Sequence, residues 1–197
     1  MRLSPLLIVW LFLCSQNAIA EEASMRVDGD AFTVKFVGKP LNGDKLVEYV
    51  RDSESFDRWT KLIGYRYEHR PELANDPIKY ANAMALSIKL ANPKTNYQLL
   101  KNEKSTEGIL DFLLVPSEKD GFFELNVFRY WKNKEGDAIY SIQLVQRFGI
   151  PTIAPGSDGK AEFISLGNVL RDRRSSLIKQ ISEADKDKIE SMLAVQQ

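Results

Sequence analysis

The chain of 197 residues carries 27 lysine and arginine residues against 27 aspartate and glutamate residues, so its formal net charge is zero. This balance argues against general binding to nucleic acid or to an anionic membrane surface, because both require an excess of basic side chains. One cysteine, Cys14, and one histidine, His69, exclude an intramolecular disulfide and a zinc site built from several thiolates or imidazoles. We therefore expect no cofactor.

The first twenty residues have the three parts of a secretory signal peptide. Arg2 gives the positive start, residues 6–13 form an apolar core too short to cross a bilayer, and residues 18–20 form a small-residue cleavage site. We predict cleavage before Glu21, which leaves residues 21–197 as a single domain. A secreted chain without cysteines is typical of the periplasm of a Gram-negative bacterium, so we expect a periplasmic or secreted protein with no transmembrane segment after cleavage.

Three strands are predicted first in the mature chain. Residues 31–37 alternate apolar and polar side chains, and residues 45–50 continue as the second strand of a hairpin whose turn contains Asn42-Gly43. After a polar break, residues 59–68 are rich in β-branched and aromatic side chains, which favours a third strand.

A helix is predicted to begin at Asp76, which supplies an N-cap oxygen. Pro77 follows at the first helical position, where its missing N–H costs nothing. Apolar side chains then recur at helical spacing, at Ile78, Ala81, Met84, Ala85 and Ile88. Pro93 ends the helix, and the small residues on its apolar face predict close packing on a sheet.

Four extended segments follow, at residues 97–103, 108–115, 122–132 and 138–148. Successive strands joined by short turns pair antiparallel, so these segments predict a meander at the centre of the fold. The second segment is apolar at almost every position except Asp111, which predicts that both of its sides are covered. In the last two segments the even positions are mainly apolar and the odd positions are mixed.

A loop rich in proline and glycine is predicted next, and two C-terminal helices follow it. The apolar stripe of the first helix is Phe163, Leu166, Leu170, Leu177 and Ile181. Ser182, with Asp185 three residues later, predicts the start of the second helix. The whole order predicts an α+β fold, an antiparallel sheet of about six or seven strands with helices on one or both faces. Over residues 31–181 this order resembles the PsbP-like α/β sandwiches, and the resemblance implies a small binding or assembly factor.

Two groups of residues are candidates for a binding surface. The first lies on the third strand and consists of Trp59, Tyr65, Arg66, Tyr67, His69 and Arg70. The second assumes that odd positions of the last two strands share one exposed sheet face, and consists of Arg129, Trp131, Ser141, Gln143 and Arg147. Aromatic rings stack on sugars or packed side chains, and paired guanidinium groups bind carboxylates. Alternatively, the rings form core beneath the first helix, and a register shift of one residue scatters the second group.

These observations predict a non-enzymatic binding or accessory protein that acts on a protein or cell-envelope partner. An immunity-type inhibitor of a toxin is one alternative. Another is a small hydrolase that uses His69 or two of four carboxylates, namely Glu48, Glu54, Asp111 and Glu124. A Ser-x-x-Lys motif begins at Ser176, but it lies too near the C-terminus for a penicillin-recognising enzyme, so we interpret it as a polar helix face.

Overall fold

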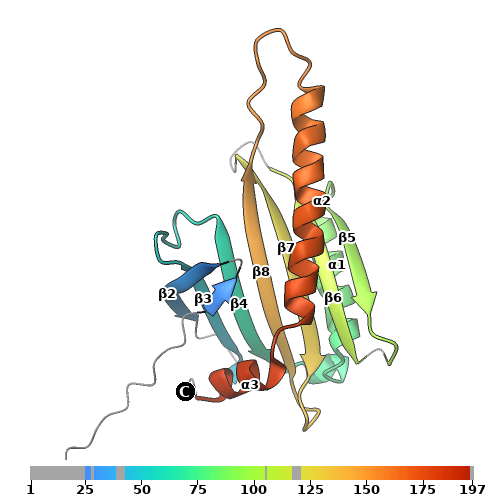
Figure 1. The fold of residues 1–197 in the computed structure, drawn as a ribbon. Coiled ribbons are helices and arrows are strands. Elements are labelled where there is room, and N and C mark those ends of the chain that lie inside the picture. The colour runs from blue at the N-terminus through green and yellow to red at the C-terminus, as the bar shows by residue number, and fades with distance from the viewer. Residues whose placement is uncertain (1–24, 28, 39–42, 105, 117–120, 196–197) are drawn as a thin grey trace, which may run out of the picture.

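The computed structural model describes residues 25–27, 29–38, 43–104, 106–116 and 121–195. The predicted signal peptide lies outside these residues, as does Asn42 of the first predicted turn. The described residues form one antiparallel sheet of eight strands and three α-helices, which confirms the α+β class (Figure 1). The sheet exceeds the expected size because residues 25–27 pair with the strand that follows them.

The strands are β1 (Met25–Val27), β2 (Asp30–Gly38), β3 (Lys45–Arg51), β4 (Lys61–Glu68), β5 (Asn96–Lys101), β6 (Glu107–Leu114), β7 (Phe122–Lys132) and β8 (Ile139–Gly149). The helices are α1 (Pro77–Ala91), α2 (Lys160–Ser182) and α3 (Lys186–Val195). In the sheet the strands follow the order β1-β2-β3-β4-β8-β7-β6-β5. The predicted hairpin and meander are both present, and within the described sheet they are joined where β4 pairs with β8.

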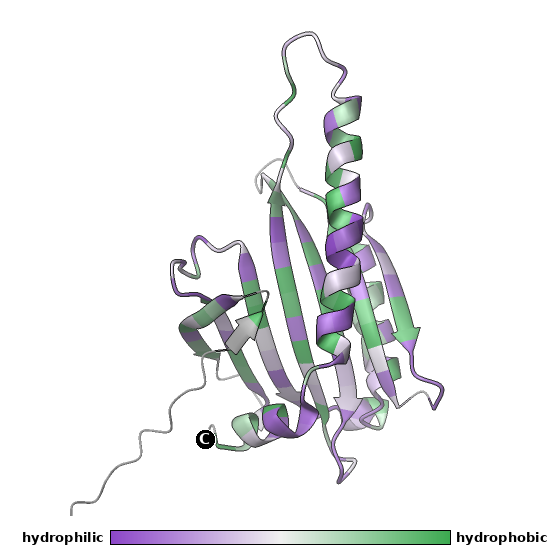
Figure 2. Ribbon diagram, in the orientation of Figure 1, coloured by the Kyte–Doolittle hydropathy of each residue, from purple (hydrophilic) through white to green (hydrophobic). Residues whose placement is uncertain are grey.

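The helices cover opposite faces of the sheet, and we name the faces after them. α1 packs on β5, β6 and β7, whereas α2 and α3 lie on the other side (Figure 1). Phe128 and Tyr130 of β7 belong to the α1 face, and Val127 and Trp131 belong to the α2 face. Successive side chains along a strand point to opposite faces of the sheet, and hydropathy alternates accordingly along the central strands (Figure 2).

The start of α1 follows the sequence prediction. The Asp76 side chain accepts hydrogen bonds from the backbone N–H groups of Ile78 and Lys79, at 2.8 and 3.0 Å. Ala81 and Ala85 are completely buried against the sheet. Their small side chains let the helix axis approach the strands closely, as expected.

α2 is only half covered by the sheet. Leu177 and Ile181, near its C-terminal end, are buried, but its N-terminal end projects beyond the strands (Figure 1). Phe163, the first member of the predicted apolar stripe, is 44% exposed there, so that stripe is not wholly a core stripe. No helix in the described part of the chain is both long enough and apolar enough to cross a bilayer.

α3 has a different cap from the one predicted. Asp185 accepts a hydrogen bond from the backbone N–H of Lys188 at 3.1 Å, so Asp185 caps the helix. Ser182 is instead the last residue of α2, and its hydroxyl donates to the carbonyl of Lys179 at 2.7 Å.

Candidate functional site

The second predicted group of residues does not share one face, so that prediction is wrong. Lys132 of β7 pairs with Ile139 of β8, an even position with an odd one. Arg129 and Trp131 consequently lie on the α2 face, whereas Arg147 lies on the α1 face. The other β8 members of the group accompany Arg147 on the α1 face, and they are Ser141 and Gln143.

Arg129 and Trp131 attach the C-terminal helices to the sheet. The Arg129 guanidinium donates to Glu107 at 2.7 Å and to the carbonyl of Ser182, in the last turn of α2, at 2.8 Å. The Trp131 indole N–H donates to Glu190 of α3 at 2.8 Å. Glu107, on the neighbouring strand β6, thus supplies the carboxylate partner of Arg129. The Arg129 and Trp131 side chains are therefore covered by the C-terminal helices, and both have hydrogen-bond partners inside the protein.

The first predicted group is also divided. Tyr65 is completely buried on the α2 face, and Tyr67 packs edge to face on a neighbouring ring there. Trp59 precedes β4 and packs with apolar side chains of the α1 face. The Arg147 guanidinium lies 3.4 Å from the centre of its ring. His69 is exposed just beyond the strand. The core interpretation thus holds for Tyr65, but beneath α2 and α3 rather than α1.

A row of hydrogen bonds crosses the α1 face from β3 to β7. Arg66 donates to Gln143 at 2.7 Å and to Glu48 at 3.3 Å, and Gln143 donates to Asn126 at 2.8 Å. A Cβ atom at Gly64 would lie 3.2 Å from the Gln143 oxygen, so a larger residue there would crowd this row. We call the connected side chains the polar ladder: Glu48, Arg66, Gln143, Asn126, Glu124 and Arg147.

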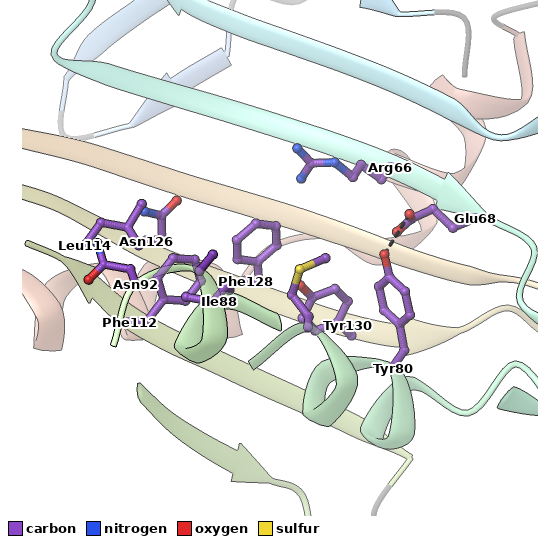
Figure 3. A pocket seen from close by; sticks show the side chains of 12 residues that line it. Arg66, Glu68, Tyr80, Ile88, Asn92, Phe112, Leu114, Asn126, Phe128 and Tyr130 are labelled. Carbon is purple, nitrogen blue, oxygen red and sulfur yellow. Dashed lines mark hydrogen bonds between the residues drawn. The ribbon is translucent and has the colours of Figure 1, made fainter. Parts of the chain in front are cut away.

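A groove of about 480 Å³ lies between α1 and the polar ladder (Figure 3). Its floor is a stack of rings in which Phe128 lies 6.0 Å from Phe112 and 5.4 Å from Tyr130, centre to centre. α1 supplies one wall, with Met84 and Ile88 among its side chains, and Arg66 stands on the opposite side (Figure 3). We call this space the α1 groove. Its size and its mainly apolar lining are those of a small-molecule site.

One end of the α1 groove is polar and buried. The Glu68 side chain, in a residue only 9% exposed, accepts hydrogen bonds on Oε1 from the Tyr80 hydroxyl at 2.8 Å and from Arg70 at 2.7 Å. Glu68 Oε2 has no hydrogen-bond partner within the described residues. The same is true there of the hydroxyl of Tyr130, which is 1% exposed. Burial raises the pKa of both tyrosines well above the ordinary value, so both remain neutral hydroxyls.

The side chains suggested for hydrolysis are dispersed. Glu48 and Glu124 stand on the polar ladder with β4 and β8 between their strands. Glu54 lies in the loop after β3, and Asp111 is buried on the α2 face. His69 donates its backbone N–H to a neighbouring carboxylate and stays exposed. Within the described ranges, no three acidic, histidine or cysteine side chains gather in a metal-binding group.

The groove residues were not among the predicted site residues. The even positions of β7 were predicted to be mainly apolar, and Phe128 and Tyr130 are indeed buried, but they also form the groove floor. Glu68 and Tyr80 lie on different elements and meet only in the folded chain. No local sequence pattern marks this contact, because it joins the end of β4 to α1.

Comparison with known proteins adds a family. Neither a curated protein nor a solved structure matches the chain, and the resemblance to PsbP-like sandwiches stays a prediction. One family model matches residues 20–186, which include all eight described strands and the α1 groove. Because the match covers most of the 197-residue chain, the chain belongs to this protein family.

Proposed function

We propose that the chain is a secreted, non-enzymatic binding protein that holds a small amphiphile of the cell envelope in the α1 groove. The observation that carries the proposal is the groove itself, with its floor of stacked rings and its buried polar end. Pockets for small ligands combine such apolar walls with a few polar atoms that fix orientation. The predicted signal peptide supports a location outside the cytoplasm, and the dispersed carboxylates do not support a hydrolase.

The apolar part of the ligand supplies the affinity. Each buried methylene contributes about 0.8 kcal/mol, so a chain of about ten carbons contributes roughly 8 kcal/mol before the cost of immobilising it. A cost of about 4 kcal/mol leaves a Kd on the order of 1 mM from the chain alone, so tighter binding requires the polar end of the groove as well. Tyr130 and Phe128 offer flat faces to such a chain and are held in place by their own stacking, at 5.4 Å.

A fluorescent apolar probe tests the proposal. N-phenyl-1-naphthylamine should gain fluorescence with the wild-type protein and should bind about tenfold more weakly to Met84→Trp, because the indole fills the groove that Met84 lines. Leu86→Trp is the matched control, since Leu86 is an exposed residue of the same helix that does not line the groove. Wild-type protein that fails to bind the probe, or equal binding by the two variants, would refute the proposal. A periplasmic form that begins at Glu21 would support the location.

A further inference from the structure

We infer that the polar end of the α1 groove binds a primary ammonium group, so that the amphiphile is an alkylamine in its protonated form. This inference rests on the proposed function of the groove. It depends on three observations: which polar atoms lack partners, what charge surrounds them, and how the apolar floor continues from them.

The two guanidinium groups at the polar end already have oxygen acceptors within the protein. Arg70 donates to Asp44 at 2.8 Å, to the carbonyl of His69 at 2.8 Å and to Glu68 at 2.7 Å. Both terminal nitrogens of Arg66 have acceptors on the polar ladder. Two polar atoms on the groove lining lack a partner in the part of the chain that the structure describes, the carboxylate oxygen Glu68 Oε2 and the hydroxyl of Tyr130. A carboxylate oxygen only accepts, so the missing partner is a donor that the ligand brings.

The unpartnered Tyr130 hydroxyl completes the subsite. It lies on the groove lining with Glu68, and both residues are more than nine-tenths buried. An ammonium has three N–H donors and no acceptor. One N–H reaches Glu68 Oε2, and a second reaches the oxygen of Tyr130. A buried polar atom left unsatisfied is costly, so these two atoms favour a ligand that donates to both.

The charge at this end also favours a cation. Arg66 pairs with Glu48, whereas Arg70 pairs with both Asp44 and Glu68, so the second set has two carboxylates for one guanidinium and one negative charge more than its positive charge. A buried charge is stabilised by an opposite charge with which it shares a hydrogen bond. An anionic head would instead place a second negative charge beside the Glu68 carboxylate, and like charges at close range are unfavourable.

The apolar floor leads away from the polar end. From Tyr130 the stacked rings continue through Phe128 to Phe112, and Leu114 lines the far end (Figure 3). A single chain that starts at the Glu68 carboxylate therefore keeps apolar contact along the groove. The ligand class that fits both ends is an unbranched or singly branched alkyl chain with a terminal ammonium.

Three ligands of equal chain length test the head group. Dodecylamine, dodecanol and dodecanoate are titrated against the probe-loaded wild-type protein at neutral pH and below their aggregation concentrations. Dodecylamine should displace the probe with an affinity about tenfold higher than dodecanol. Glu68→Gln should remove most of that preference and leave dodecanol unchanged, and Tyr130→Phe should weaken dodecylamine by about threefold. Tyr97→Phe, at an exposed tyrosine of β5, is the matched control and should change nothing.

The outcomes separate this inference from the proposed function. Equal affinity for the three ligands, or tighter binding of dodecanoate, overturns the ammonium subsite but leaves a groove that binds amphiphiles. Absence of probe binding to the wild-type protein overturns the proposed function instead. If Glu68→Gln does not fold, the wild-type ligand series and Tyr130→Phe decide the matter, because removing a hydroxyl without a partner does not weaken the core.

Discussion

Arg174→Met should destabilise the protein, because it leaves a buried carboxylate without its cation. Asp111 of β6 is completely buried on the α2 face, and Arg174 Nε of α2 lies 2.7 Å from its Oδ1. Neither carboxylate oxygen of Asp111 has a hydrogen-bond partner among the described residues, so the contact with Arg174 is an ion pair without hydrogen-bond geometry. Methionine keeps most of the apolar stem of arginine, so the change isolates the loss of charge.

The magnitude and its pH dependence follow from this geometry. Removing one partner of a fully buried pair costs about 3–5 kcal/mol, but the Arg174 side chain is 37% exposed, which reduces the expected loss to about 2 kcal/mol. Burial raises the pKa of Asp111 and Arg174 opposes that rise, so the pKa rises further in the variant. A folded-state pKa above the unfolded value means that stability falls as pH rises from the unfolded-state pKa to the folded-state pKa. The loss is at most about 1.4 kcal/mol per pH unit, and stability changes no further above the folded-state pKa.

Urea unfolding at mildly acidic and mildly alkaline pH measures both effects. Arg174→Met should lose more stability at the higher pH, and Asp111→Asn with Arg174→Met should return to within about 1 kcal/mol of wild type. Arg171→Met, at an exposed arginine of the same helix, is the control and should have little effect. An equal loss for Arg174→Met at both pH values, or no recovery in the double variant, would refute the reasoning.

Three further predictions concern stability. Leu110→Ala should lower the free energy of unfolding by about 2–5 kcal/mol in urea melts, because Leu110 is completely buried beneath α1. Leu113→Ala should lower the free energy of unfolding by less, because Leu113 is only half-buried. Asp76→Ala should cost about 1 kcal/mol through loss of the α1 cap, and Asp76→Asn should restore most of it in the same assay. Burial alone would raise the pKa of Glu54, but hydrogen bonds, the first from Arg51, lower it to about 2. Glu54→Gln should therefore cost about 1–2 kcal/mol at neutral pH, and thermal melts should show this gap closing as pH falls from about 4.5 to about 2.

Elements with local signals were predictable from sequence. The Asp76-Pro77 pair marks the start of α1 because the cap and the first turn involve only neighbouring residues. The meander strands were predictable for a similar reason, since each is an apolar run bounded by turn residues. These signals fix where strands lie along the chain, and they place the strands in sequence order within each half of the sheet.

The register of the last hairpin was not predictable, and it decided the candidate surface. The Asn133 side chain accepts hydrogen bonds from the backbone N–H groups of Asp137 and Ala138, each at 3.0 Å. Those bonds hold Ala138 in the loop, so β8 begins one residue later than expected, at Ile139. A shift of one residue moves every β8 side chain to the other face relative to β7, which separated Arg147 from Arg129.

The α1 groove required tertiary information. Periodicity shows that α1 has an apolar face, but it does not show how far across the sheet the helix lies. α1 packs on β5, β6 and β7 and leaves the α1 face of β4 beside it, which is where Arg66 and Glu68 stand. A wider or displaced helix would turn the same rings into ordinary core.

The pairing of β4 with β8 has a consequence for how the chain folds. Every other neighbouring pair in the described sheet joins strands that are consecutive in sequence, so each half of the sheet can assemble from short-range contacts on its own. The β4–β8 pairing instead closes the long segment between Glu68 and Ile139, and a closure of that length slows folding more than it weakens the final structure. We expect this pairing to form last, and the Arg66–Gln143 hydrogen bond across it to act mainly on the rate at which the two halves separate.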